Sequence, residues 1–299
     1  MQLGDPQAAS ALDQAASVFV GLRPRLFGIA YRMLGSATEA EDIVQEAWVR
    51  WQTTDRTAVK DPSAFLATTT TRLAINVAQS ARSRRETYVG PWLPEPVDTN
   101  TDLEAGAVRG EALELAVLLL LERLSPTERA AYVLRESFDY PYGQIAAVLQ
   151  LSEANTRQLV SRARKHIAAQ RRRPVSSAAH RRLLEAFLAA ARMGDVAALE
   201  ELFASDVVSY SDGGGAVRGA ARILVIGRTR VAKVVAAFAP RFWPGAAIEW
   251  VEANGRPGVL VSHGGTVVAL LTISASAQGI DQIMWVMNPA KLSHWPPSN

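Results

Sequence analysis

Cysteine is absent from the sequence, which excludes disulfide bonds and thiolate catalysis, and only four histidines remain as nitrogen ligands for a metal. The first ten residues have neither a basic region nor an apolar core, so they lack the pattern of a signal peptide. Residues 258–280 are uncharged, but His263 and two glycines interrupt them, and their alternation is typical of a buried strand. We therefore expect a soluble, cytoplasmic protein with no membrane contact, no metal and no cofactor.

Acidic residues are missing from one segment and basic residues from another. Residues 154–173 contain no Asp or Glu, whereas they carry Arg157, Arg162, Arg164, Lys165, Arg171, Arg172 and Arg173. Residues 39–46 contain no Lys or Arg, whereas they carry Glu39, Glu41, Asp42 and Glu46. A net charge of +3 on 299 residues does not by itself indicate a nucleic-acid partner. The separation of sign predicts two surfaces with different partners.

Proline marks the joints between three blocks. Pro91, Pro94 and Pro96 interrupt the helical periodicity, and a second joint surrounds Pro174. We expect a helical domain at 15–86, a linker at 87–107, a second helical domain at 108–173, and an α+β domain at 174–299. In the last domain, helices should precede strands near 207–211, 247–253, 258–263, 266–274 and 280–287.

Two helix starts are marked by their capping residues. Thr38 followed by Glu41 has the spacing of a capping box. Asp61 before Pro62 is suited to cap a helix that has proline in its first turn. The sequence therefore predicts helices beginning near residues 39 and 62.

Residues 142–167 have the pattern of a helix-turn-helix. Apolar residues at 145–149 give a short amphipathic helix, a turn follows at 150–152, and Ser152 is suited to cap the next helix. On that second helix, Val160, Ala163 and Ile167 share one stripe, which we expect to be buried.

The opposite stripe of the second helix suits DNA. Asn155, Thr156, Arg157 and Gln158 lie at its start, where Asn, Gln and Arg could pair with base edges in the major groove. Ser161, Arg162, Arg164 and Lys165 follow and are better placed for phosphates. A solvated basic face is the alternative, but the preceding helix and turn favour DNA binding.

The stretch "LSPTERAAYVLRESFDYPYGQIAAVLQLSEANTRQLVSRARKHI" resembles region 4 of sigma-70-type factors, in which the helix-turn-helix binds the −35 promoter element. "EAEDIVQEAWVRW" and "AFLATTTTRLAINVAQSARSRR" resemble region 2, which docks on RNA polymerase and melts the −10 element. No region 1 or 3 intervenes, which is the plan of the extracytoplasmic-function sigma factors. The resemblance covers roughly residues 15–172.

The resemblance implies partners and site residues. It implies core RNA polymerase (the β′ clamp helices and the β flap) and promoter DNA as partners. The polymerase-binding residues would be Glu39, Asp42, Ile43, Gln45, Glu46 and Trp48. The −10 residues would be Arg72, Asn76, Arg82, Arg84 and Arg85, with Asn76 contacting a flipped base and residues 53–62 walling its pocket. An ordinary amphipathic helix at 39–51 and a locally bonded Asn76 are the alternatives.

The third block resembles the SnoaL-like cone fold, and three signatures narrow the resemblance to the group of these sigma factors with a fused SnoaL-like extension, often called group 41. They are "WLPEP" at 92–96, "DGGG" at 212–215 and "NPAKL" at 288–292. The chain departs from the group at Ala216 and Ala290, where lysine and aspartate are usual. We expect these interdomain regulatory residues to meet: Trp92, Leu93, Pro94, Asp212, Gly213, Gly214, Gly215, Asn288, Pro289 and Lys291.

The extension could instead be an enzyme, because cone-fold isomerases use a carboxylate base and oxyanion donors. The available groups are Asp195, Asp206, Tyr210, Asp212 and His263, yet no spacing identifies a base–donor pair, and capping explains Asp206 more simply. We expect no enzyme, and a small-molecule ligand of the C-terminal pocket is a further candidate partner. The competing interpretation is a helix-turn-helix regulator fused to a ligand-binding or isomerase-like domain, which would not need the acidic polymerase-docking helix.

Overall fold

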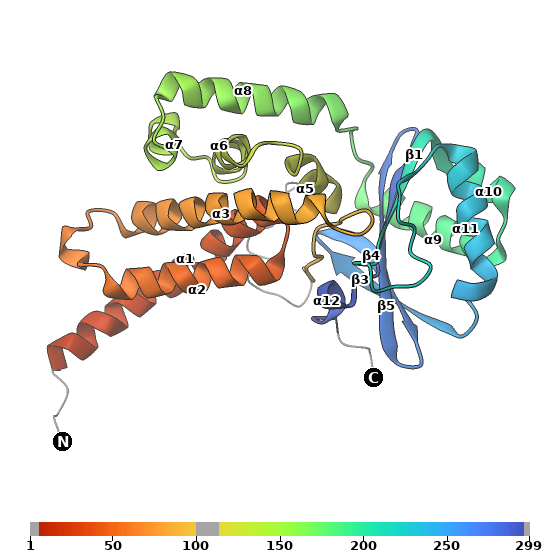
Figure 1. Cartoon of the computed structure of the whole chain (residues 1–299), viewed down its shortest axis with the longest axis horizontal. Helices are drawn as coiled ribbons and strands as arrows, with labels where there is room; N and C mark the ends of the chain where they lie inside the picture. The colour runs from red at the N-terminus through yellow and green to blue at the C-terminus, as the bar shows by residue number, and fades with distance from the viewer. Residues whose placement is uncertain (1–5, 100–113, 296–299) are drawn as a thin grey trace. The chain divides into compact units, whose positions relative to one another are not determined.

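The computed structural model describes residues 6–99 and 114–295, with the side chains of 6–12 and 82–86 left out of the description. The chain divides into two compact units. The first comprises the described residues of 1–83 and 120–167, and the second comprises those of 84–103, 113–119 and 168–299. Figure 1 follows both units along the chain from red to blue.

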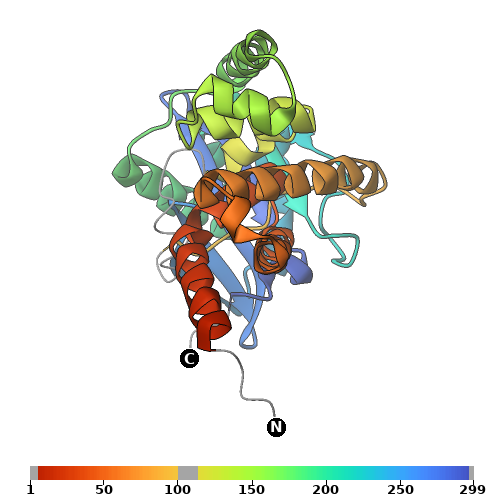
Figure 2. The same ribbon diagram turned by 90° about the vertical axis from the view of Figure 1, so that its left-hand side faces the viewer.

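The first unit is helical. Its elements are α1 (Pro6–Leu34), α2 (Ala37–Thr53), the short 3₁₀ helix η1 (Arg56–Ala58), α3 (Pro62–Glu86), α6 (Pro126–Glu136), α7 (Tyr142–Leu149) and α8 (Glu153–Gln170). Most of α5 (Leu115–Leu121) belongs to the second unit. The helices α6–α8 lie above α1–α3 in two perpendicular views (Figures 1 and 2). They share a core, because Ile29 and Ala67 pack with Leu134, Ile145 and Val160.

The helix starts correct one expectation and confirm another. Ser36, in an extended conformation, accepts from the backbone N–H of Glu39 at 3.2 Å and is the N-cap of α2, so the prediction of a cap at Thr38 was wrong. Asp61 accepts from the backbone N–H groups of Ser63 and Ala64 at 2.9 and 3.1 Å, which confirms the predicted start of α3.

The helix-turn-helix forms as the sequence predicts. Gln150 takes the left-handed conformation (φ 56°) in a turn that has no glycine, and Ser152 accepts from the N–H of Asn155 at 3.2 Å. The predicted stripe of Val160, Ala163 and Ile167 is buried. The outer stripe of α8, which includes Arg157, Ser161 and Lys165, is exposed to solvent.

The second unit is a curved sheet with helices on one face. Its elements are α9 (Ser177–Met193), α10 (Val196–Leu202), β1 (Phe203–Asp212), β2 (Val225–Ile226), α11 (Arg228–Phe242), β3 (Ala246–Ala253), β4 (Arg256–His263), β5 (Thr266–Ser276), β6 (Gly279–Val286) and α12 (Pro289–Leu292). The strand order is β2-β1-β6-β5-β4-β3, in which only β1 and β6 are parallel. All five predicted strands are present, and the two-residue β2 was not predicted.

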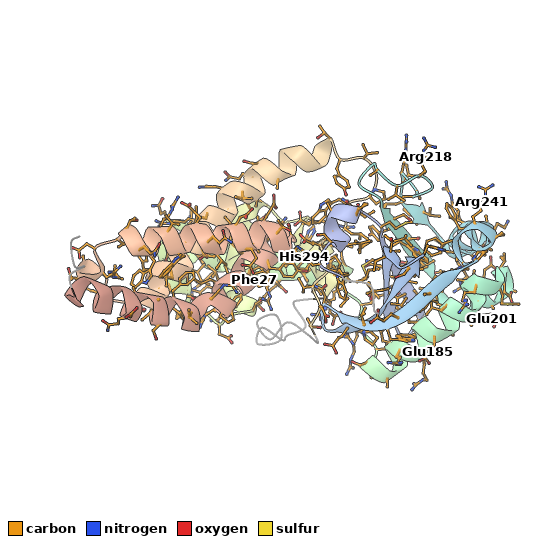
Figure 3. All side chains as sticks on the ribbon, turned by 90° about the horizontal axis from the view of Figure 1, so that it is seen from below. Phe27, Glu185, Glu201, Arg218, Arg241 and His294 are labelled. Carbon is orange, nitrogen blue, oxygen red and sulfur yellow. The ribbon has the colours of Figure 1, made fainter. Side chains whose placement is uncertain are left out.

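The core of this unit lies between the sheet and two helices. Phe187 of α9 and Val231 of α11 pack with Val259, Leu271 and Ile283 of the sheet. Polar side chains such as those of Glu185 and Arg241 point away from the sheet on the outer side of the helices (Figure 3). This division follows the amphipathic pattern of the helices.

The proline-rich linker packs on the sheet of the second unit, because Leu93, Pro94 and Val97 are buried and Asp98 forms a β-bridge with Ala253. One expectation is corrected in this unit. Asp206 is not a helix cap. It lies within β1, where its carboxylate pairs with Arg172 at 2.7 Å.

Candidate functional site

The exposed stripe of α8 carries most of the predicted −35 residues. Asn155, Arg157, Gln158, Ser161, Arg162, Arg164 and Lys165 are exposed. Thr156 is not: its side chain is fully buried and its hydroxyl donates to the carbonyl of Ser152 at 3.0 Å, because it faces the core at the first turn. The surface available to a groove therefore lacks Thr156.

Acidic neighbours hold two of the arginines on α8. Glu153 accepts from Arg157 one turn away, and the Arg157 guanidinium lies 4.4 Å from the centre of the Tyr142 ring. Arg164 donates twice to Glu136 of α6, at 3.0 and 2.7 Å, and this hydrogen bonding raises the pKa of Arg164. Each of these two guanidiniums keeps further N–H donors that no carboxylate occupies, and both side chains are exposed.

The predicted −10 surface on α3 is partly engaged. Asn76 is exposed. Arg72, however, reaches the C-terminal end of α7, where its Nε donates to Val148 O at 2.9 Å and its Nη2 to Ala147 O at 3.1 Å. Arg82, Arg84 and Arg85 lie on α3, and their side chains are outside the described residues. In this state Arg72 fastens the first helical block to the helix-turn-helix.

The acidic face of α2 is open to solvent. Asp42, Gln45 and Glu46 are exposed, Glu39 is half-buried, and Trp48 is half-buried against Phe19 with ring centroids 4.9 Å apart. Ile43 differs from the expectation, because it is buried in the core of the unit. The exposed surface therefore combines acidic side chains with Trp48, and one of the acids, Glu46, pairs with Arg50 at 2.8 Å.

The buried carboxylate of Asp212 contacts residues from the other two signature segments, 92–96 and 288–292. It ends β1 and is fully buried, with Oδ1 accepting from the Tyr88 hydroxyl and Oδ2 from the backbone N–H of Leu93 at 2.8 Å. The ammonium of Lys291 lies 2.7 Å from Oδ2. A buried carboxylate needs these partners, because an unpaired buried charge is strongly disfavoured.

Lys291 and Asn288 complete this arrangement, which we call the Asp212 knot. Lys291 donates also to the carbonyl of Leu93, and its ammonium lies 4.5 Å from the centre of the Trp92 ring. Asn288 caps α12 and donates to the Tyr88 hydroxyl at 3.0 Å. Burial, together with the hydrogen bond to Asp212, raises the pKa of Tyr88 above its ordinary value, so the phenol stays protonated and donates.

The glycines of the "DGGG" turn are needed for different reasons. Gly214 and Gly215 have φ of 59° and 76°, which disfavours side chains. A Cβ on Gly214 would also lie 2.5 Å from Asn288, and one on Gly213 would lie 2.7 Å from Ala220. The turn thus lets the 213–222 loop, the α12 cap and the linker approach one another closely. Ala216 and Ala290 are both exposed, and the backbone N–H of Ala290 donates to Asn288 Oδ1 at 3.1 Å.

Residues outside the predicted set also fix the linker. Tyr88 is one, although it stands four residues before Trp92 and could have been suspected as an aromatic beside a proline-rich motif. Thr99 accepts from the N–H of Gly255 and donates to Glu252, and Asn254 accepts from the N–H of Val97 at 3.1 Å. Glu114 pairs with Arg256 at 2.7 Å. No local pattern predicts these long-range partners.

The groups considered for catalysis have structural partners. Asp195 caps α10, Asp212 belongs to the knot, and His263 hydrogen-bonds Phe242 O at 2.9 Å. Within residues 6–99 and 114–295, no three His, Asp or Glu side chains gather as metal ligands. No helix in that part of the chain is long and apolar enough to cross a membrane.

Comparison with known proteins gives family matches in both helical blocks. Residues 18–85 match the family model "Sigma-70 region 2", and residues 114–167 match "Sigma-70, region 4". The chain is 41% identical over 252 residues to the ECF RNA polymerase sigma factor SigJ of Mycobacterium tuberculosis, covering 81% of this chain and 79% of that protein. It is 31% identical over 286 residues to the protein named probable ECF RNA polymerase sigma factor SigI of the same species, covering 94% and 95%.

A solved structure is similar to this chain over the C-terminal domain as well. The crystal structure of SigJ from Mycobacterium tuberculosis superposes with a TM-score of 0.76 at 33% identity, covering 95% of this chain and all of the other. The helical blocks and the domain with the mixed sheet are therefore shared with that protein.

Proposed function

This chain belongs to the extracytoplasmic-function sigma factors, which direct RNA polymerase to promoters, and we propose that its C-terminal SnoaL-like domain regulates that activity in cis. The domain assignment that supports this proposal is region 2 at 15–86, linker at 87–107, region 4 at 108–173 and SnoaL-like domain at 174–299. Promoter-specific initiation follows from the family matches. The regulation is our inference from the contacts of the linker.

We assign roles to the exposed residues on the helical blocks. Asn155, Arg157 and Gln158 contact −35 base edges, while Ser161, Arg162, Arg164 and Lys165 contact phosphates. Asn76 and the basic residues of α3 (Arg72, Arg82, Arg84 and Arg85) contact the −10 element. Asp42, Gln45, Glu46 and Trp48 dock on the β′ clamp helices, and region 4 docks on the β flap. The protein acts in the cytoplasm, where promoter DNA and core polymerase are.

The Asp212 knot is the observation that carries the proposal. The linker leads out of the region 2 block, and its residues 88–99 are fastened to the SnoaL-like domain by Asp212, Lys291 and Asn254. A passive spacer would not bury Leu93 and the adjacent prolines. A ligand or partner that strengthens or weakens the docking of residues 88–99 would therefore change how far the region 2 and region 4 blocks can move apart.

The contact between those two blocks supports the same proposal. The −10 and −35 elements are about 25 base pairs apart, which is about 85 Å of duplex at roughly 3.4 Å per base pair. Arg72 of α3 nevertheless donates to two carbonyls of α7, next to the −35 helix. We propose that this contact breaks when the blocks bind a promoter, and that the linker must permit their separation. A ligand or partner that favours one state shifts the balance by its differential affinity.

The proposal excludes catalysis by the C-terminal domain. Asp195 caps α10, Asp206 pairs with Arg172, Asp212 belongs to the knot and His263 hydrogen-bonds a carbonyl at a strand end. The fused-enzyme alternative would need one of them free and facing a pocket.

A run-off transcription assay with core polymerase tests the proposal. The full-length protein should give promoter-specific transcripts that depend on both −10 and −35 sequences. Truncation after Arg173 should change promoter binding or transcription clearly. If the full-length and truncated proteins give the same promoter-specific transcripts, the chain is still a sigma factor, but the proposed cis-regulation is overturned.

A further inference from the structure

A pocket in the SnoaL-like domain lies between the sheet and α11. Its empty space, which includes open solvent at the mouth, is about 540 Å³. Four aromatic side chains line it: Phe238, Phe242, Trp243 and Trp285. Two serines of β1, Ser209 and Ser211, supply hydroxyl groups, and Gly219 and Ala221 of the 213–222 loop close one side.

The lining fits the body of an uncharged, flat molecule. No Asp, Glu, His, Lys or Arg is among the residues that line the pocket, so a charge placed at its floor would lose hydration without a partner. Aromatic rings favour a planar apolar ligand through stacked and edge-on contacts. Because no titratable side chain lines the pocket, its residues suit ligand binding and do not suit proton transfer.

Basic residues stand beside several of the pocket-lining residues in the sequence. Residues 213–248 contain no Asp or Glu, and they carry Arg218, Arg222, Arg228, Arg230, Lys233 and Arg241. All six are exposed, and none pairs with a carboxylate in the described part of the chain. Arg218 and Arg222 flank the pocket residues Gly219 and Ala221, and Arg218 and Arg241 point outward from the domain (Figure 3). A ligand with an acidic group at the mouth would be attracted there.

The same loop that walls the pocket also touches the linker. A Cβ built on Gly90 would lie 3.7 Å from Ala221 O, and one on Gly215 would lie 3.1 Å from Val89 Cβ. The 213–222 loop is therefore packed between the linker on one side and the pocket on the other. An occupant that fixes Gly219 and Ala221 fixes the surface on which Val89 and Gly90 rest.

We propose that this pocket binds a flat, apolar carboxylic acid of one or two rings, with the rings among the four aromatic side chains and the carboxylate at the basic mouth. Binding strengthens the docking of the linker through the 213–222 loop. The inference rests on the proposed function only for its consequence in transcription, because the pocket and its ligand class stand without it.

Calorimetry of the full-length protein with 2-naphthoate tests the ligand class, with the neutral 2-naphthamide as the matched probe. We expect 2-naphthoate to bind, 2-naphthamide to bind about 5-fold more weakly at low salt, and the difference to shrink at high salt. No heat from either compound would overturn the proposal. Equal affinities at low salt would overturn the requirement for an acidic group.

Pocket-filling variants test the location. Val234→Phe places a ring in the pocket from α11, and Ser211→Leu fills it from β1, so either should weaken 2-naphthoate binding at least about 10-fold. Ala237→Phe is the control, since it adds the same ring at an exposed position of the same helix, and it should bind as wild type. Having both filling variants keeps the test valid where one does not fold. Unchanged binding in a folded filling variant would place the site elsewhere.

Hydrogen exchange tests the link to the linker. The amide of Leu93 donates to Asp212, and its exchange should slow when 2-naphthoate binds. Binding without any change at Leu93 would overturn the link. If 2-naphthoate does not bind while truncation after Arg173 still alters transcription, only this inference fails. If it binds while truncation has no effect, only the cis-regulation fails.

Discussion

At the scale of single residues, Asp212 and Asp206 show how burial decides what a carboxylate contributes. Both lie on β1 and both pair with a cation at 2.7 Å, but the side chain of Asp212 is fully buried and that of Asp206 is 62% exposed. Asp212→Ala leaves Lys291 without its carboxylate, and we expect it to lower the free energy of unfolding by about 3–5 kcal/mol. Asp206→Ala should cost no more than about 1 kcal/mol.

Denaturant unfolding of the two variants, followed in the full-length protein, measures the difference. A cost for Asp212→Ala as small as that for Asp206→Ala would show that the knot does not hold the linker.

His180 gives a pH dependence to the second unit. It is buried with its Nε2 3.0 Å from Pro257 O, and burial, with the nearby charge of Arg256 adding to it, lowers its pKa to about 4. As the pH falls below 6.5, His180 binds a proton in the unfolded chain but stays neutral in the folded chain. The free energy of unfolding therefore decreases as the pH falls from 6.5 to 4. The total loss should be about 3 kcal/mol.

The measurement compares wild type with His180→Gln, whose amide can still donate to the carbonyl of Pro257. The variant should lack the part of the pH slope between 6.5 and 4 that is due to His180. Identical slopes in the two proteins would contradict the lowered pKa.

At the scale of elements, the exposed residues of α8 are expected to differ in role according to their position along the helix. Arg157→Ala should weaken discrimination between matched and mismatched −35 elements by about 1–3 kcal/mol, because it removes a base contact near the start of the helix. Lys165→Ala should weaken binding to all sequences and lower the salt slope by about one, because it removes a phosphate contact.

Binding titrations on both DNA types at several salt concentrations separate these outcomes. Equal losses on matched and mismatched DNA for Arg157→Ala would move that residue to the phosphate contacts. Glu153→Gln is a useful control, since it frees Arg157 from its helical partner and leaves the side chain in place.

At the scale of the whole molecule, the linker connects the state of the SnoaL-like domain to the promoter-binding blocks. Trp92→Ala removes the ring beneath Lys291, and we expect it to change promoter binding or transcription in the same direction as truncation after Arg173, but less. Wild-type behaviour from both proteins would contradict the regulatory role. Comparing the two is informative because truncation also exposes the buried Leu93, whereas the single substitution keeps the domain.

Local chemistry in the sequence was enough to indicate most elements and the family. Asp61 before Pro62 and the apolar stripe of Val160 and Ile167 act within one or two turns, so they can be recognised without a fold. The strands of the third block alternate in the same local manner. The motifs "WLPEP", "DGGG" and "NPAKL" also indicated, through the family resemblance, which segments would meet.

Tertiary structure alone decided how those segments meet and which predicted residues remain accessible. The partners of Asp212 stand at positions 88, 93 and 291, and a sequence pattern cannot specify which donor reaches which oxygen across such separations. Thr156 and Ile43 were expected on binding surfaces, but close packing against neighbouring helices buried them. Arg72 was expected at DNA and instead contacts α7, because the free carbonyls at the end of a helix attract a cation once the fold brings it near.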